Sequence, residues 1–126
     1  MTQPVPVFVI DDELSVRRAL DRLLRAYGYR VHTFASVDEF LAHDRADSPA
    51  CLVVDLRMPG KTGLDLLQAL NASGAAMPVV FMTGHGDVPM MRALHADAVA
   101  FLTKPFDDRA LLNAIDLALR HGDRPR

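Results

Sequence analysis

The fold of this chain is decided by the stretch Cys51-Leu52-Val53-Val54-Asp55-Leu56-Arg57-Met58-Pro59-Gly60. A short apolar run leads into a carboxylate, and a Pro-Gly pair soon breaks the chain. Such a run is typical of a strand that is buried on both faces of a parallel sheet. Asp55 then stands at the carboxyl end of the strand, where open α/β sheets place their ligands and chemistry. On this stretch alone, a solvated loop aspartate is an equally good interpretation.

Length and composition set the class of protein. The chain has 126 residues, which is the size of one domain with a real core. We expect a single domain over residues 1–126, with its core in about 5–120 and a tail or the start of a linker in 121–126. Fourteen Lys and Arg against sixteen Asp and Glu give a net charge of −2. This balance offers no basic field for nucleic acid or for anionic lipid.

Cysteine content and hydropathy narrow the class further. Cys51 is the only cysteine, so the sequence excludes a disulfide framework and a thiolate metal site. Its place in an apolar run favours an inert core thiol. The N-terminal residues lack the features of a signal peptide, and no segment approaches the roughly 20 apolar residues of a membrane span. We therefore expect a cytoplasmic protein with no membrane partner.

Strand and helix patterns alternate along the chain. Besides the central run, strands are predicted at 5–10, 29–34, 78–83 and 98–102, of which 29–34 is typical of an edge or half-buried strand. Helices are predicted at about 14–27, 36–41, 62–70, 88–95 and 107–120. Gly28 should stop the first, and Leu64, Leu67 and Leu70 form the apolar stripe of the third. The fourth, short and Met-rich, should be the least ordered. Five such alternations indicate a parallel sheet with helices on both faces, a (βα)5 three-layer α/β sandwich.

Polar residues stand where the predicted strands end. They are Asp11, Asp12, Asp55, Thr83 and Lys104. Because the carboxyl ends of parallel strands lie at one edge of the sheet, these side chains should meet there. Three carboxylates and one ammonium leave a charge of −2, which one Mg²⁺ would neutralise, and Mg²⁺ prefers oxygen ligands.

Each of these residues also has a purely structural interpretation. Asp11 and Asp12 could cap a helix, Thr83 could be a turn residue, and Lys104 could be a solvated charge. The five histidines show no ligand pairing in the sequence and are interpreted as surface residues. The structural interpretations do not explain why complementary groups follow four different strands.

Over about residues 5–120 the sequence resembles the receiver domain of bacterial two-component response regulators. The motifs that carry the resemblance are Asp11-Asp12, Val53-Val54-Asp55 with Met58-Pro59 and Gly63, Thr83-Gly84, and Phe101 before Lys104-Pro105. The stretch from Phe81 to Pro89 further resembles the nitrogen-fixation type of regulator, in which a helix-turn-helix output domain usually follows. The resemblance implies a flavodoxin-like sheet with strand order 2-1-3-4-5.

The resemblance also implies roles for individual residues. Asp55 takes a phosphoryl group from a sensor histidine kinase, with Thr83 and Lys104 assisting. Asp12, Asp55 and the backbone carbonyl of Arg57 hold Mg²⁺ directly, and Asp11 helps through water. The protein is then no enzyme beyond catalysing its own phosphorylation and dephosphorylation.

A switch and an output face follow from the same resemblance. The Thr83 hydroxyl moves toward the phosphoryl group and the Phe101 ring turns inward, while a cis bond before Pro105 directs Lys104. The surface of the fourth helix, fifth strand and fifth helix is the expected output face and a possible homodimer interface. DNA is contacted only through an output domain, if one follows. Asp97 stands where the family commonly has glycine. This departure affects the expected order of the fourth helix and leaves the phosphorylation site unchanged.

The residues present disfavour two other functions that this fold supports. A phosphatase with an aspartyl nucleophile usually has a second acid two residues later, and here that residue is Arg57. A flavin-binding protein would need a Ser/Thr-rich phosphate loop after the first strand, where acidic residues stand instead. The alternative that stays open is a phosphorylation-independent interaction module of the same fold.

Overall fold

The protein is described by a computed structural model that covers residues 5–43, 51–56, 58, 60, 62–73, 77–84 and 100–122. Five parallel strands form one sheet in the order β2-β1-β3-β4-β5. They are β1 (Pro6–Ile10), β2 (Arg30–Phe34), β3 (Cys51–Asp55), β4 (Val79–Thr83) and β5 (Ala100–Thr103). The predicted strand order is confirmed, and so is the edge position of β2.

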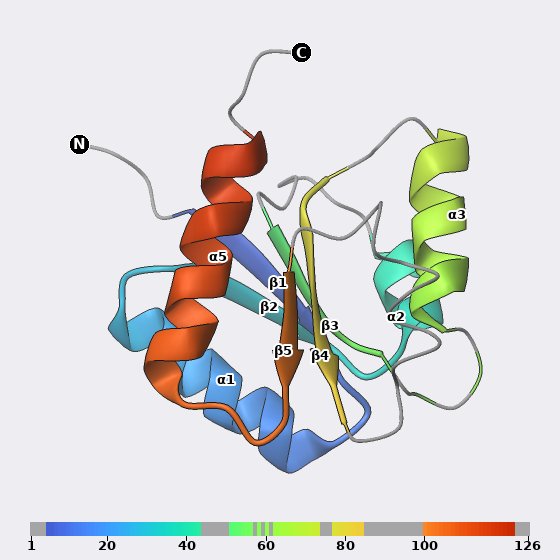
Figure 1. Cartoon of the computed structure of the whole chain (residues 1–126). Helices are drawn as coiled ribbons and strands as arrows, with labels where there is room; N and C mark the ends of the chain where they lie inside the picture. Colours follow the sequence, from blue (N-terminus) through green and yellow to red (C-terminus); the bar gives the residue numbers. More distant parts are fainter. Residues whose placement is uncertain are drawn as a thin grey trace.

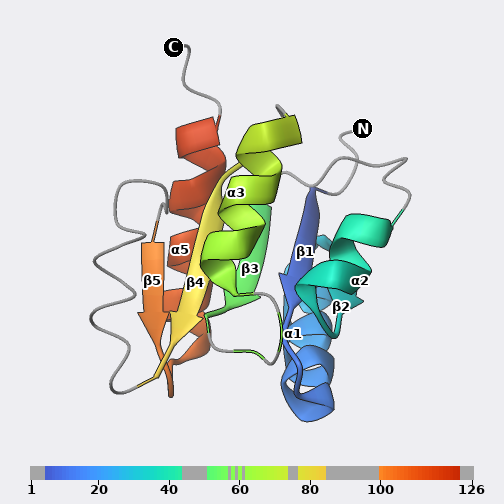
Figure 2. The same ribbon diagram turned by 90° about the vertical axis from the view of Figure 1, so that its right-hand side faces the viewer.

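Helices cover both faces of this sheet. Those described are α1 (Leu14–Ala26), α2 (Val37–Ala42), α3 (Gly63–Ser73) and α5 (Asp108–Gly122). Helices α2 and α3 lie on one face of the sheet, and α1 and α5 lie on the other (Figures 1 and 2). The predicted three-layer α/β sandwich is therefore confirmed. The predicted fourth helix, at 88–95, and Asp97 lie outside the described residues.

The sheet separates two apolar cores, and β3 contributes to both. Leu52 and Val54 pack in the core under α2 and α3, whereas Cys51 and Val53 pack in the core under α1 and α5. All five residues of β3 are buried, which explains its continuous apolar run. Burying an aliphatic side chain of this size contributes about 1.5–3 kcal/mol. Burial also raises the pKa of the Cys51 thiol to about 12, as expected for an inert core cysteine.

Local signals in the sequence fix the helix ends. The Ser36 hydroxyl accepts a hydrogen bond from the Glu39 N–H at 3.0 Å and begins α2. The Asp107 carboxylate accepts one from the Ala110 N–H at 2.8 Å, so Asp107 caps α5 rather than joining it. Gly28, with φ at 91°, ends the first helical segment as predicted.

Helix α3 buries a wider face than the predicted one. Leu67 and Leu70 are buried as expected, and Leu66, which the predicted stripe omits, is fully buried as well. Leu66, Leu67 and Leu70 belong to the same apolar core as Leu52 and Val54 of β3. Among the described helices, none is long and apolar enough to cross a membrane.

Candidate functional site

The register of the strands brings the predicted residues to one edge of the sheet. Ile10 pairs with Val54, so the residues that follow them, Asp11 and Asp55, lie at the same level. Asp55 in turn pairs with Met82, next to Thr83. Thr83 pairs with Thr103, the residue before Lys104. Four strands therefore deliver their polar side chains to the same place.

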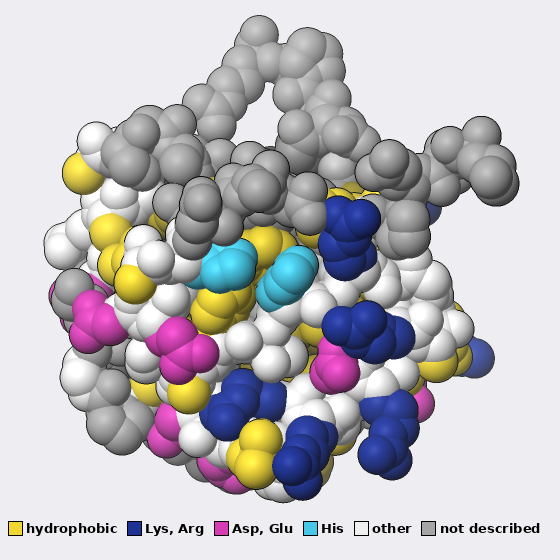
Figure 3. Space-filling model, turned by 180° about the vertical axis from the view of Figure 1, so that it is seen from behind, with side chains coloured by type: hydrophobic (Ala, Val, Ile, Leu, Met, Phe, Trp, Pro, Cys, Tyr) yellow, Lys and Arg dark blue, Asp and Glu magenta, His cyan; other side chains and the backbone are white. Residues whose placement is uncertain are grey.

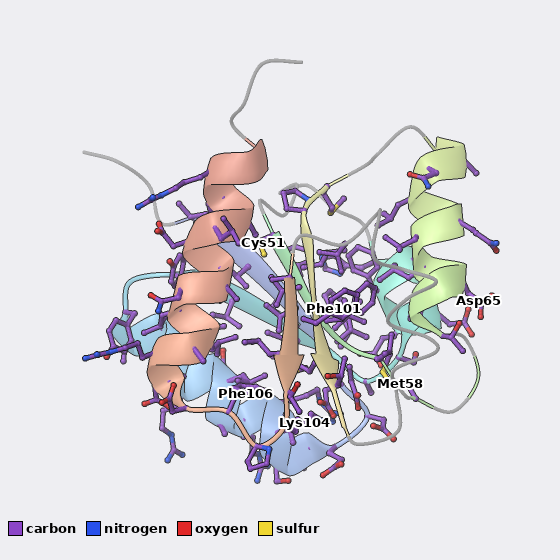
Figure 4. All side chains as sticks on the ribbon, in the orientation of Figure 1. Cys51, Met58, Asp65, Phe101, Lys104 and Phe106 are labelled. Atoms are coloured by element: carbon purple, nitrogen blue, oxygen red, sulfur yellow. The ribbon has the colours of Figure 1, made fainter. Side chains whose placement is uncertain are left out.

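An ammonium group lies between two of the carboxylates. The Lys104 Nζ is 3.3 Å from the Asp11 Oδ2 and 3.6 Å from the Asp55 Oδ2. Asp11 is fully buried, and Asp55 is 8% exposed. Lys104 lies at the end of β5 where its arrow points (Figure 4). Buried carboxylates need such a counter-charge, because an unpaired buried charge is strongly destabilising.

The pKa of Lys104 reflects this position. Partial burial on its own lowers the pKa, because it penalises the charged form. The attraction of Asp55 and Asp11, together with the hydrogen bond to Asp11, outweighs burial and raises the pKa above its ordinary value of 10.5. Lys104 is thus firmly protonated at neutral pH and acts as a fixed positive charge.

The three carboxylates are suited to a metal ion. One oxygen from each of Asp11, Asp12 and Asp55 lies within 4.8 Å of the other two. Octahedral Mg²⁺ binds oxygens at about 2.1 Å, so its ligand oxygens are at most about 4.2 Å apart. Oxygens up to 4.8 Å apart suit an ion that contacts some of these carboxylates directly and another through water. All of the donors are hard oxygens, which fits Mg²⁺ and disfavours softer metals.

The two aspartates of the acidic pair differ in their surroundings. The Asp11 Oδ1 accepts a hydrogen bond from the Glu13 N–H at 2.9 Å, just before α1, and its Oδ2 faces Lys104. Asp11 therefore has part of the structural role that its position suggests, but it also contacts Lys104 across the edge. Asp12 is exposed and more accessible to an ion. The Asp12 carboxylate could therefore approach an ion directly, whereas both Asp11 oxygens are already engaged.

Thr83 lies next to this cluster. The Thr83 side chain is 1% exposed, and its hydroxyl donates to the Leu102 carbonyl at 3.3 Å. The Lys104 N–H donates to the Thr83 carbonyl at 2.7 Å. The peptide bond between Lys104 and Pro105 is cis, which confirms that prediction. A direct backbone link thus joins the hydroxyl-bearing strand to the lysine.

The Phe101 ring is only partly buried and stacks on Phe81. Their ring centres are 5.8 Å apart and the ring planes differ by 22°. The sequence alone did not identify Phe81 as a neighbour of Phe101. The two residues pair across β4 and β5, and this strand register is visible only in the structure. Arg57, the predicted source of a carbonyl ligand, lies outside the described residues.

An apolar groove of about 830 Å³ opens beside the cluster, between α1 and the beginning of α5. Lys104 forms part of its wall, and Phe106 lies next to it (Figure 4). The remaining lining residues are Ser15, Val16, Ala19, Leu20, Arg22, Leu23, Ala26, Pro105 and Asp108. Such a groove can accept apolar side chains from another molecule within reach of the carboxylates.

Comparison with known proteins gives a family match over most of the chain. The model described as the response regulator receiver domain matches residues 7–116. Nodulation protein W of Bradyrhizobium diazoefficiens is 45% identical over 121 residues, which are 95% of this chain and 53% of that protein. Transcriptional regulatory protein FixJ of Azorhizobium caulinodans is 46% identical over 120 residues, 94% of this chain and 57% of that protein.

Solved structures agree with these relatives. Full-length FixJ from B. japonicum superimposes with a TM-score of 0.88 at 39% identity, covering 97% of this chain and 61% of that chain. The crystal structure of FixJ-N gives a TM-score of 0.83 at 40% identity, covering 95% of this chain and 97% of that chain. The chain therefore spans about half the length of the relatives in sequence and nearly all of FixJ-N.

Proposed function

The chain belongs to the response regulator receiver family, and we propose that it is a phosphorylation-activated switch whose acceptor is Asp55. The observation that carries the proposal is the position of Lys104, which lies between Asp11 and Asp55 at an edge that Asp12 also reaches. The phosphoryl donor is a phosphohistidine on a sensor kinase. The relatives are regulators rather than classical enzymes, and we propose that this chain catalyses only its own phosphorylation and dephosphorylation.

The chemistry is an in-line transfer to a carboxylate. An Asp55 oxygen forms the new O–P bond as the N–P bond of the phosphohistidine breaks, and the imidazole nitrogen keeps the bonding electron pair. Lys104 balances the charge of the entering group by binding a phosphoryl oxygen. Asp12, Asp55 and the Arg57 carbonyl would hold Mg²⁺, and Asp11 would assist through water. When bound, the ion neutralises charge on the phosphoryl oxygens.

The switch uses Thr83 and Phe101. A phosphoryl group adds roughly −1.5 to −2 of charge and new acceptor oxygens. The Thr83 hydroxyl, which now donates to the Leu102 carbonyl, can donate to one of these oxygens instead. Its movement frees space beside β5, and the partly exposed Phe101 ring turns inward to fill it. Pro105 keeps the chain after Lys104 in its present direction.

Partners are proposed for three surfaces. The groove beside Lys104 receives the kinase, because the donor must come within bonding distance of Asp55. The face of the predicted fourth helix, β5 and α5 carries the output and can form a homodimer. On helix α5, the large apolar side chain of Leu117 is 53% exposed. The chain itself does not bind nucleic acid. DNA is contacted only through an output domain, if one follows, and the FixJ relative is itself named a transcriptional regulatory protein.

The acceptor can be identified chemically. An aspartyl phosphate is an acyl phosphate, which borohydride reduces to homoserine at the modified position. After incubation with acetyl phosphate and Mg²⁺, peptide mass spectrometry should find homoserine at residue 55, with Asp11 and Asp12 unchanged. Reduction at Asp11 or Asp12 would refute the assignment. A folded, Mg²⁺-binding protein without any reduced aspartate would favour the phosphorylation-independent interaction module.

A further inference from the structure

Two histidines that are separated along the sequence lie together in the structure. His32 is in the middle of β2, and His43 follows α2. Their ring centres are 5.8 Å apart and the ring planes differ by 45°. Both side chains are half-buried. They are the only histidines whose side chains the structure describes, and Figure 3 shows them next to each other over an apolar surface.

Aromatic rings hold the two imidazoles in place. Phe8 pairs with His32 across β1 and β2, and their ring centres are 4.9 Å apart. The His43 ring is 5.1 Å from Phe34 and 6.1 Å from Phe8. The His43 N–H also donates to the Phe40 carbonyl at 3.1 Å, which fixes its backbone at the end of α2. Neither imidazole can turn far from the other without losing these contacts.

This arrangement has the dimensions of a metal site. Two imidazoles that bind one zinc ion at Zn–N distances of about 2.0–2.1 Å have ring centres roughly 5–6 Å apart. The observed separation lies in this range. An apolar floor under the ligands lowers the local dielectric and limits their motion, which favours binding over free imidazoles in water.

We propose that His32 and His43 form a binding site for a divalent transition-metal ion such as Zn²⁺ or Cu²⁺. Neutral imidazole nitrogens suit these ions, whereas the carboxylates of Asp11, Asp12 and Asp55 suit Mg²⁺. The two sites share no residue. A hard ion such as Mg²⁺ would therefore bind at the carboxylates, and a borderline ion such as Zn²⁺ would bind at the two imidazoles. With two protein ligands, the remaining coordination positions are filled by water or by a group from another molecule.

The test uses the intact chain saturated with Mg²⁺, so that the carboxylates are occupied. Calorimetric titration with Zn²⁺ should show one binding event in the wild type. His32→Gln and His43→Gln should each weaken it by about tenfold or more. The double variant should show no binding event, and the second change should cost less than the first, because one remaining imidazole is already a poor ligand. His121→Gln, a histidine change on α5 across the sheet, is the matched control and should leave the affinity unchanged.

A second measurement needs no variant. Substoichiometric Cu²⁺ is paramagnetic and broadens nearby amide resonances in the Mg²⁺-saturated wild type. Broadening should centre on residues 31–34 and 40–43, from β2 and the end of α2. Broadening centred on Asp11, Asp12 and Asp55 would overturn the proposal, as would Zn²⁺ binding that survives both histidine changes. In either case the two imidazoles would serve only to pack against Phe8 and Phe34.

Discussion

Lys104 is the residue on which the charge of the site depends. It contacts a fully buried carboxylate and an almost buried one, and they hold it protonated. A bound cation would also compensate part of the negative charge of these carboxylates. The energetic value of Lys104 should therefore depend on Mg²⁺, which distinguishes a functional charge from an ordinary surface lysine.

Replacing Lys104 by Met should destabilise the protein by about 1–3 kcal/mol without Mg²⁺, because two carboxylates lose a charged hydrogen-bond partner. Saturating Mg²⁺ should restore most of this loss, and the variant should bind Mg²⁺ more tightly than the wild type. Urea unfolding with and without the ion measures both effects. Arg109→Met, an exposed cation in the first turn of α5, is the control. An equal loss with and without Mg²⁺ would contradict this account of the lysine.

The same lysine predicts a pH dependence. Its folded pKa is raised above the ordinary 10.5, so its contribution to the free energy of unfolding is complete below pH 10.5. The contribution is lost as the pH rises through the folded pKa. The stability difference between wild type and Lys104→Met, measured without Mg²⁺, should therefore be constant at neutral pH and shrink in strongly alkaline solution. A difference that shrank around neutral pH, where both the lysine and the carboxylates are charged, would assign it to another group.

At the scale of elements, α3 meets β4 at a glycine. A Cβ added at Gly63 would lie 2.5 Å from the Phe81 Cε1, and Phe81 is the ring on which Phe101 stacks. The close approach of the helix start to the strand therefore also sets the position of the proposed switch residue. Only a residue without a side chain allows this contact.

Gly63→Ala should destabilise the protein by about 1–3 kcal/mol, the usual cost of forcing extra atoms into a packed core. The displaced Phe81 ring should also shift the aromatic resonances of Phe101. Urea unfolding and NMR spectra measure the two effects. Gln68→Ala, at an exposed position of the same helix, should change the stability by no more than about 0.5 kcal/mol. A neutral Gly63→Ala with an unmoved Phe101 would show that the two rings are not coupled to the start of α3.

The groove between α1 and α5 gives a prediction about the partner. Ala19 lines it and is exposed, so Ala19→Arg should fill the groove without disturbing the core. Phosphotransfer from the kinase should slow by about tenfold or more, which is ~1.4 kcal/mol. Phosphorylation by acetyl phosphate should be unchanged. Ala42→Arg on α2 is the matched control, and equal effects of both changes on the kinase reaction would argue against docking at the groove.

For the whole molecule, the sequence was informative wherever the signal is local or periodic. The run that ends in Asp55 predicts a central strand, and the alternation of strands and helices predicts the sheet. Because all strands of a parallel sheet point the same way, residues as distant as Asp11 and Lys104 could be placed at one edge. Their contact at 3.3 Å confirms this reasoning.

Features that depend on lateral neighbours were not predictable in the same way. The stacking of Phe81 on Phe101 and the pairing of His32 with His43 arise from strand register and from where a short helix ends. No spacing in the sequence encodes them. The histidines were interpreted as surface residues without a ligand pairing, and nothing in the sequence indicated that the half-buried rings of His32 and His43 are neighbours. The full burial of Leu66 was missed because the width of the buried face depends on how α3 lies on the sheet.

The central claim is that Asp55 accepts a phosphoryl group with the help of Mg²⁺, and intact mass tests it most directly. The chain is incubated with acetyl phosphate, with Mg²⁺ or with a chelator, beside Asp55→Asn. The account predicts one added phosphoryl group in the wild type with Mg²⁺ and none in the other two samples. A folded, Mg²⁺-binding wild type that gains no mass would contradict it, and so would an adduct that persists in Asp55→Asn.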